Sequence, residues 1–557
     1  MVPHLLESCL LLISRQPLAT TALLALGWAL ALRSEAVRRR LPRLERNTRP
    51  VVLTAAGLVL AAFAAFGVWY AEQPGFACEV EPQVATVSAL MNDGAPVYHT
   101  VDAAERYSIL YGPSLYLVTG ALLEVFGPSI PVAKSGAAAA LILSLPLLFM
   151  ALRRHVRHDS ALALTAAGAL LYWTQGTSPF VLRPDPYLIL AVTAGLWAAG
   201  LPRRAWAVLL TAAALAFAVN LKIHAALYLL PVLALLHLHH GLKATLLALP
   251  AGLILTLAPF AFHPGIDPYL YAQWIGVTLH HGLDWSIFPL LLRRTAFYTL
   301  PMLIPLLLGG RLSRRPRLAR ELALVWLASN ASVLVLATKP GAGLVHLLPL
   351  IPVNLVYGAR MWAALPDRAA RWRGPVGQWG RGAALAFLLT AAVFGSVVGY
   401  RSGRQAEAVM AGSQDLATDI HAILEARSGH TVGMGYGGEG ANFLVTYLRP
   451  LLAFAHQPVL LDAISMMDAE RADLELSTKS LAMLDQGVID VWLIPRGQEP
   501  FQKQNWYAPH HPIFPDAFRE RFRANYRLES RSRYFDLWEW RGVQQAGGGG
   551  AGGSSSR

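Results

Sequence analysis

Charged residues are scarce in this sequence. Asp, Glu, Lys and Arg make up 15% of its 557 residues, whereas soluble globular proteins carry about 25% charged residues. The chain is strongly apolar, because 55% of its residues are hydrophobic. This composition argues against a protein that is surrounded by water alone.

Cysteine is nearly absent as well. The sequence has two, Cys9 and Cys78, in different segments and without the spacing of a CxxC motif or a metal site. It therefore indicates neither a disulfide framework nor a zinc site. We interpret both residues as small apolar side chains.

Acidic residues are the rarer charged class, with 34 Asp and Glu against 47 Lys and Arg, for a formal charge of +13. Such an excess can indicate a nucleic-acid-binding protein. Here the arginines cluster in short loops between apolar runs, as the positive-inside rule describes for membrane proteins. The sequence predicts contact with membrane lipid and no nucleic-acid partner.

Long apolar runs are what the sequence has in abundance. A helix needs about 20 residues to cross about 30 Å of hydrocarbon. Runs approaching this length cover residues 51–70, 131–152, 244–262 and 383–400. They predict a polytopic α-helical membrane protein.

The two ends of the chain look different from the rest. The apolar run at residues 17–32 precedes Arg38, Arg39 and Arg40, whereas a signal peptide places its charge first, so we expect an extra span or an interfacial helix. Residues 546–557 form a Gly/Ser tract that resembles a linker or tag remnant. We expect residues 1–50 to be an N-terminal hydrophobic segment and basic loop, 51–400 a transmembrane module and 401–545 an extracytoplasmic domain.

Basic loops predict the sidedness. They cover residues 33–50, 153–158, 202–204, 311–320 and 360–381, and all should be cytoplasmic. The opposite side then holds a first outer loop at residues 71–112, a second at 263–295, and everything after residue 400. If residues 112–126 also crossed the membrane, every later basic loop would lie on the outer side. We therefore expect this segment, which is bracketed by Gly-Pro pairs, not to cross. About eleven spans then remain from residue 51 onward, and 11–13 in the whole chain.

The C-terminal segment has shorter apolar runs and more charge. Residues 430–437, 458–463 and 489–495 read as strands and residues 468–486 as an amphipathic helix, which predicts a small α/β domain. Its first strand leads into a GxGxxG pattern at Gly433, Gly435 and Gly438. A tight turn explains this pattern better than a nucleotide site, because nucleotides are scarce outside the cytoplasm.

The first outer loop contains the closely spaced acidic residues Glu79 and Glu81, ahead of a predicted interfacial helix with Val84, Val87, Ala89 and Leu90 on or near its apolar side. A partly desolvated carboxylate there would suit a general base toward a hydroxyl acceptor. The alternatives are a solvated acidic loop and a helix cap.

Basic residues also interrupt apolar sequence on the predicted outer side, where cations should be rare. Arg183, Lys222 and Lys339 would together suit an anionic head group such as a lipid phosphate. Asp185 fits a helix cap. Snorkelling is the alternative for the two lysines. The second outer loop mixes polar and aromatic residues, which suits either sugar stacking or an interfacial belt.

In the order of its motifs, the chain resembles the GT-C superfamily of polytopic glycosyltransferases, of the protein mannosyltransferase or aminoarabinose transferase type. The resemblance covers residues 51–400 and rests on GAPVYH, YGPSLYLVTGALLEVFG, RPDPYLIL, NLKIHAALYLLP and KPGAGLVHLLPLIP. It implies that the acidic dyad of the family falls on Glu79 or Glu81. Val80 separates the two here, so which one is catalytic stays open.

The resemblance implies transfer of a sugar, with inversion, from a polyprenyl-phosphate-linked donor to an extracytoplasmic glycan, lipid or protein acceptor at a bacterial inner membrane. The implied donor-phosphate residues are Arg183, Lys222, His224, Lys339 and His346, and the implied substrate-binding residues are Asp185, Tyr98, Tyr111, His263, Tyr269 and His280. A lipid monophosphate donor would need no metal. A diphosphate donor would favour a divalent ion, with Asp284 or Asp102 as ligands.

Two other classes of protein also fit the sequence. A polytopic transporter or flippase is one, although no inverted repeat is evident and an outer domain is unnecessary for transport. A non-catalytic subunit of an envelope-assembly complex is the other.

Overall fold

The computed structural model describes residues 15–31, 34–309, 316–364, 375–438 and 441–542. Cys9, the Gly/Ser tract and parts of the basic segments 311–320 and 360–381 lie outside these residues. The chain divides into two compact units, each built from several stretches of sequence. The first comprises residues 1–71, 137–258 and 283–406, and the second comprises residues 72–136, 259–282 and 407–557.

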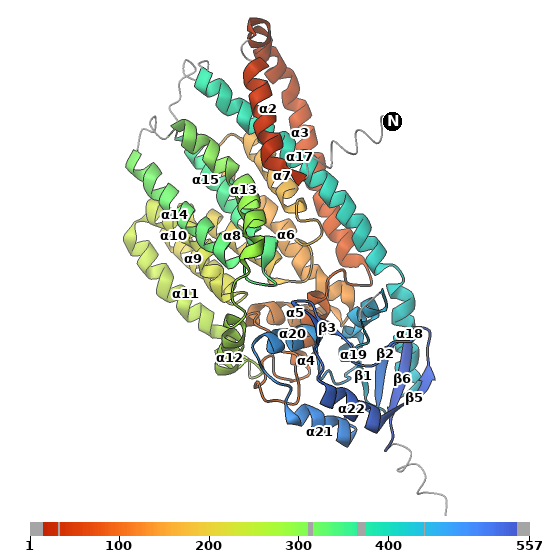
Figure 1. Ribbon diagram of the computed structural model, residues 1–557. Helices are drawn as coiled ribbons and strands as arrows, with labels where there is room; N and C mark the ends of the chain where they lie inside the picture. Colours follow the sequence, from red (N-terminus) through yellow and green to blue (C-terminus); the bar gives the residue numbers. More distant parts are fainter. Residues whose placement is uncertain (1–14, 32–33, 310–315, 365–374, 439–440, 543–557) are drawn as a thin grey trace, which may run out of the picture. The chain divides into compact units, whose positions relative to one another are not determined.

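The first unit is helical (Figure 1). Its helices are α2 (Pro17–Ala31), α3 (Glu35–Glu72), α6 (Ile130–Leu152), α7 (His158–Trp173), α8 (Pro184–Ala199), α9 (Arg204–Val219), α10 (Ala226–His240), α11 (Leu242–Phe262), α13 (Phe288–Gly309), α14 (Pro316–Leu336), α15 (Leu350–Ala363) and α17 (Pro375–Met410), of which α3, α6, α11 and α17 extend into the second. Short 3₁₀ helices precede three of them: η1 (Ile223–Ala225), η2 (Trp285–Ile287) and η3 (Gly343–Leu347).

Seven helices among the described residues are long and apolar enough to cross a membrane. They are Thr48–Glu72, Ile130–Leu152, Ile223–His240, Leu242–Phe262, Trp285–Leu307, Gly343–Ala363 and Trp379–Ala426. The prediction of a multi-pass helical membrane protein is therefore confirmed. The predicted 11–13 crossings would also require shorter helices such as α7 and α9, of 16 residues each, to cross.

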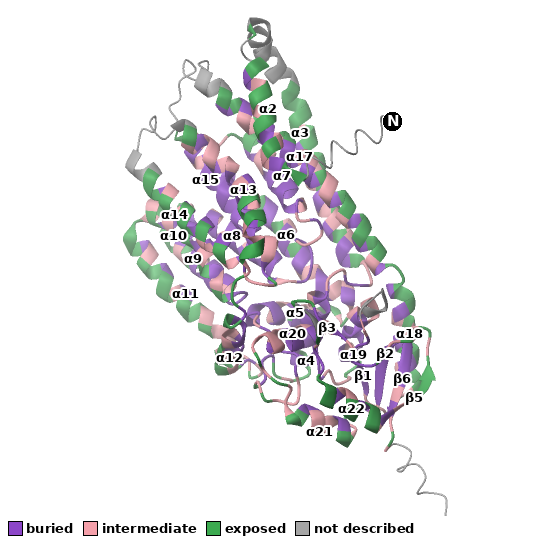
Figure 2. Ribbon diagram, in the orientation of Figure 1, coloured by how far each residue is buried: buried purple, intermediate pink, exposed green. Residues whose placement is uncertain are grey.

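Burial separates lipid-facing helices from the core of the first unit. Figure 2 shows α11 mostly exposed, and its exposed side chains are large and apolar, such as Leu253, Ile254 and Leu257. By contrast, α8 and α15 are buried over most of their length. Exposed apolar surface of this extent indicates contact with lipid, since water would not stabilise it.

Two boundaries differ from the sequence prediction. The basic segment 33–50 is no loop, because α3 begins at Glu35 and continues into the predicted span. Likewise, α17 continues past residue 400 to Met410. In both places the helix continues beyond the apolar segment into sequence that contains arginine, a residue compatible with helix.

The second unit combines short helices with a sheet. Its remaining helices are α4 (Val80–Asn92), α5 (Pro113–Phe126), α12 (Pro268–Leu279), α18 (Ser413–Ala426), η4 (Ala441–Leu448), α19 (Pro450–Phe454), α20 (Ala463–Arg471), α21 (Thr478–Gln486) and α22 (Asp516–Asn525). With 14 residues, α5 is about 21 Å long at 1.5 Å per residue, shorter than the hydrocarbon core. It packs on α4, and its predicted failure to cross the membrane stays a prediction.

The sheet of the second unit has the order β1-β2-β6-β5. Its strands are β1 (Val432–Met434), β2 (Val491–Pro495), β5 (Tyr526–Arg531) and β6 (Phe535–Trp540), and β3 (Gln504–Asn505) pairs with β4 (Ala508–Pro512) separately. Only β1 and β2 are parallel; β6 pairs antiparallel with both β2 and β5. The predicted α/β character of this segment is confirmed.

Two predictions inside this segment are wrong. Residues 458–463 form no strand but make one isolated bridge, between Leu461 and Arg106. The predicted helix 468–486 is two helices, α20 and α21, interrupted where Asp473 adopts a positive φ of 54°. A left-handed residue cannot continue a right-handed helix, which explains the break.

Close packing explains two of the three glycines of the GxGxxG pattern, Gly433 and Gly435. None of Gly433, Gly435 and Gly438 has a positive φ, so the predicted tight turn is not the reason for them. A Cβ on Gly435 would lie 2.4 Å from Ile494 Cδ1. Glycine is required there because the side chain of Ile494 occupies the space.

Candidate active site

Glu79 and Glu81 of the first outer loop lie at the start of α4, and both are buried. The loop turns into α4 just before Pro82, a residue whose fixed φ suits a first helical turn. Neither a solvated loop nor a one-sided interfacial helix describes this region, because every residue from Glu81 to Met91 is buried. Glu79 occupies the N-cap position without a side-chain cap hydrogen bond.

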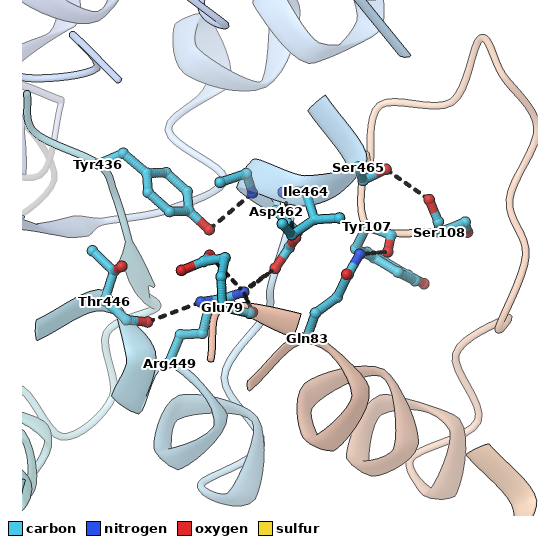
Figure 3. Close-up of polar contacts among 11 residues, drawn as sticks. Glu79, Gln83, Tyr107, Ser108, Tyr436, Thr446, Arg449, Asp462, Ile464 and Ser465 are labelled. Carbon is cyan, nitrogen blue, oxygen red and sulfur yellow. Dashed lines mark hydrogen bonds and ion pairs between the residues drawn. The ribbon is translucent and has the colours of Figure 1, made fainter. Parts of the chain in front are cut away.

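Glu79 contacts a buried arginine from the C-terminal segment. Arg449 Nη2 lies 3.1 Å from Glu79 Oε1 and 3.3 Å from the Glu79 carbonyl oxygen. The same guanidinium binds Asp462 through Nε at 2.8 Å and Nη2 at 2.7 Å, both to Oδ2 (Figure 3). Three charged side chains, each at most 3% exposed, thus form one cluster within the second unit.

The carboxylate of Glu79 is poorly satisfied for a buried charge. Among the described residues, neither of its oxygens has a hydrogen bond of good geometry, although Oε1 is ion-paired with Arg449. Burial raises the pKa of Glu79 to about 7, and the nearby Arg449 only partly opposes this increase. A carboxyl group that titrates near neutrality can both accept and release a proton under physiological conditions.

Glu81 has a different environment. Its Oε2 accepts hydrogen bonds from the backbone N–H groups of Ala77 and Cys78, at 3.1 and 3.2 Å. Lys134 also interacts with it electrostatically, while donating to the carbonyl oxygens of Gln73 and Gly75. This glutamate therefore stabilises the backbone of the loop.

In the first unit, the structure brings three predicted residues together at the start of α8. Lys222 Nζ donates to Asp185 Oδ1 at 2.9 Å, and Arg183 Nε lies 3.4 Å from Asp185 Oδ2. The side chains of Lys222 and Asp185 are 2% and 1% exposed. Asp185 lies in the first turn of α8, as its predicted role at the helix N-terminus requires, but the N-cap residue is Arg183 and the Asp185 side chain pairs with the two cations.

Two predicted histidines adjoin this cluster. The rings of His224 and His346 stack with centroids 5.0 Å apart, and the Tyr228 hydroxyl donates to the His346 carbonyl oxygen. Electrostatic interactions connect His346 with Lys222 and Arg183, and His224 with Lys339. The five predicted phosphate-binding residues thus lie within one region of the first unit, around Asp185.

The predicted substrate-binding aromatics are divided between core and surface. Tyr98 is fully buried and its hydroxyl donates to the Tyr111 carbonyl oxygen at 2.6 Å. Tyr269 is 69% exposed, and His280 is exposed with its Nδ1 2.9 Å from the Gly276 carbonyl oxygen. His263 Nδ1 accepts from the Gly265 N–H. Tyr98 and Tyr111 thus lie in the core of the second unit, and their role in substrate binding stays a prediction.

Asp284 and Asp102, the metal ligands predicted for a diphosphate donor, have other partners. Asp284 caps η2 by accepting from the Ser286 N–H, and Asp102 is ion-paired with Lys479. Among the described residues, no three His, Cys, Asp or Glu side chains group as they would to hold a metal ion.

Sequence reasoning missed Arg449 and Asp462. Neither residue stands in a recognisable motif. The available signal was weak: Asp462 precedes a helix as an N-cap residue, and its Oδ1 does accept from the Ile464 N–H.

The fold of this chain, apolar helices with a small C-terminal sheet region, is similar to that of two solved ArnT structures. The chain is similar to the crystal structure of ArnT from Cupriavidus metallidurans in the apo state, with a TM-score of 0.51 and 15% identity over 87% of this chain and 98% of that chain. It is similar to ArnT from the same organism bound to undecaprenyl phosphate, with a TM-score of 0.51 and 16% identity over 88% and 97% of the two chains. No protein-family model and no curated protein matches the sequence.

Proposed function

We propose that this protein is a membrane glycosyltransferase that moves a sugar from a polyprenyl-phosphate-linked donor to an extracytoplasmic acceptor, with inversion at the anomeric carbon. The GT-C-type fold supports this class of enzyme, and the ArnT structure bound to undecaprenyl phosphate supports this class of donor. The proposed location is a bacterial inner membrane, with the C-terminal segment on the periplasmic side.

The cluster around Asp185 is the proposed phosphate site. Arg183, Lys222 and Asp185 together carry a net charge of +1, and Lys339 adds a further positive charge. Such a region complements the phosphate of the donor, and it stabilises the leaving lipid phosphate as its negative charge develops.

Glu79 is the proposed general base. The acceptor O–H bond breaks and its proton goes to the carboxylate, while the acceptor oxygen bonds to the anomeric carbon and the bond from that carbon to the phosphate oxygen breaks. A pKa of about 7 gives a mixture of protonation states near neutral pH, which suits proton transfer. Glu81 is the less suitable base because it accepts backbone hydrogen bonds.

The proposal depends most on one observation: a buried carboxylate at the first outer loop of a GT-C-type fold, with one oxygen beside Arg449 and the other without a hydrogen bond among the described residues. Both oxygens of Glu79 are shielded, so acceptor binding must uncover at least one of them. Binding an acceptor hydroxyl there would replace a missing hydrogen bond, a favourable exchange.

The test compares Glu79→Gln with Glu81→Gln. Mass spectrometry of co-purified lipid first identifies the donor, and release of polyprenyl phosphate from it is then measured in proteoliposomes. Glu79→Gln should reduce turnover by about 10²–10⁴-fold, the usual contribution of a general base, without loss of folded protein. Glu81→Gln should lower thermal stability and leave the turnover of the folded fraction near that of the wild type.

Each alternative class gives a different result in this experiment. A transporter or assembly subunit would release no polyprenyl phosphate in any variant. Normal turnover by folded Glu79→Gln would remove the proposed base.

A further inference from the structure

We propose that Arg449 and Asp462, both from the C-terminal segment, are positioning residues that hold the Glu79 carboxylate in its reactive orientation. The active site would then be incomplete without the segment that follows the membrane helices. This inference depends on the proposed function, because it assigns a role toward the proposed base.

The contacts of Arg449 leave its guanidinium little freedom. Nη1 donates to the Thr446 carbonyl oxygen at 3.1 Å, Nε and Nη2 bind Asp462, and Nη2 also faces Glu79 (Figure 3). All three guanidinium nitrogens have a partner, and the side chain is fully buried. A planar fork with all of its nitrogens engaged is a rigid support for a neighbouring carboxylate.

Asp462 is itself firmly held. Its Oδ1 accepts from the Ile464 N–H at the start of α20, and its backbone N–H donates to the Arg106 carbonyl oxygen at 2.8 Å. The next residue, Ala463, donates its N–H to the Tyr436 hydroxyl, just beyond β1. The position of Arg449 is therefore set through Asp462 by the sheet and by the first outer loop.

The geometry assigns different tasks to the two oxygens of Glu79. Oε1 lies 3.1 Å from Arg449, whereas Oε2 has no hydrogen bond among the described residues. Arg449 would thus anchor one oxygen and leave the other to take the proton from the acceptor hydroxyl.

The charges also identify Glu79 as the member of the cluster that exchanges a proton. Arg449 and Asp462 carry opposite charges, so the net charge of these three side chains is −1 when Glu79 is ionised and zero when it is protonated. Other groups that interact electrostatically with this region are Lys503, Tyr436 and Tyr447, with Cys78 and Glu81 on its own segment. Of these, Lys503 lowers the pKa of Glu79.

The experiment measures the pH dependence of kcat/KM for donor turnover in the full-length protein. A base must be deprotonated, so raising its pKa moves the acidic limb of the profile to higher pH. Arg449→Met removes a positive charge and should move the limb upward by about 1–3 pH units. Asp462→Asn removes a negative charge and should move it downward, and asparagine preserves the helix cap.

Two further variants separate charge from geometry. Arg449→Lys keeps the positive charge but loses the planar fork, so it should reduce kcat while the limb moves little. Arg427→Met is the matched control, since Arg427 pairs with Glu539 in the same unit without facing Glu79, and it should leave the profile unchanged.

An acidic limb that stays in place in Arg449→Met or in Asp462→Asn overturns the inference, and so do shifts in the same direction. If Arg449→Met does not fold, the near-isosteric Asp462→Asn decides alone, and a downward shift is required. Failure of the proposed function looks different: the wild type would not turn over the donor, or Glu79→Gln would turn it over normally.

Discussion

Several buried charges in this protein lie beside a partner of opposite sign, which offsets the cost of removing them from water. Lys222 and Asp185 are almost fully buried in the first unit and make a direct ion pair at 2.9 Å. Removing one partner of such a pair leaves an uncompensated buried charge, whereas replacing both leaves none. This asymmetry allows the structural role of Lys222 to be separated from its proposed role toward phosphate.

We expect Lys222→Met to destabilise the protein by about 3–5 kcal/mol, because Asp185 loses its closest cation. Adding Asp185→Asn should restore most of the stability. The double variant should still bind polyprenyl phosphate more weakly than the wild type, because it lacks the Lys222 charge. Thermal unfolding and lipid binding in detergent measure the two effects, and wild-type affinity in the double variant would show that Lys222 has only a structural role.

At the scale of elements, the helices of the first unit approach closely where glycine permits it. Gly358 on α15 faces the backbone of α13, and a Cβ there would lie 2.3 Å from the Pro301 carbonyl oxygen. Gly395 on α17 is similar, since its Cβ would lie 2.3 Å from the Leu170 carbonyl oxygen on α7. Small residues allow this kind of backbone contact between membrane helices.

Gly358→Ala should therefore separate α13 from α15 and lower stability by about 1–3 kcal/mol, as overpacking usually does. Gly57→Ala is the matched control, because a Cβ at Gly57 on α3 meets nothing within 4 Å. That variant should unfold at or slightly above the wild-type temperature, since alanine favours helix more than glycine does. Equal unfolding temperatures for the two variants would contradict the proposed close contact.

For the whole molecule, the functional question is which ends of the helices face which side of the membrane. The basic segments predict that residues 153–158 are cytoplasmic and that the chain after residue 400 is not. Each region contains an exposed residue suitable for labelling: Arg157 in the first, and Glu520, on α22, in the second.

We expect Glu520→Cys to react with a membrane-impermeant maleimide in spheroplasts, and Arg157→Cys to react only after the membrane is opened. Both native cysteines are replaced by alanine in this background, and donor turnover is checked beforehand. Labelling in the opposite order would invert the topology and place the proposed base on the cytoplasmic side.

Local properties of the sequence predicted much of the site. Arg183, Lys222, His224, Lys339 and His346 were selected because they interrupt apolar sequence, and the structure places them in one region. Position alone did not distinguish Glu79 from Glu81, because both precede the same helix. Only the hydrogen bonds of Glu81 and the guanidinium beside Glu79 separate the two.

The sequence by itself determined that this is a multi-pass helical membrane protein with a C-terminal α/β segment, because hydropathy and helix length are properties of neighbouring residues. Tertiary structure decided the partner of Glu79, because Arg449 is 370 residues away along the chain. It also decided which charges are buried. Ion pairs between distant residues depend on how elements pack, and no local pattern of the sequence records that packing.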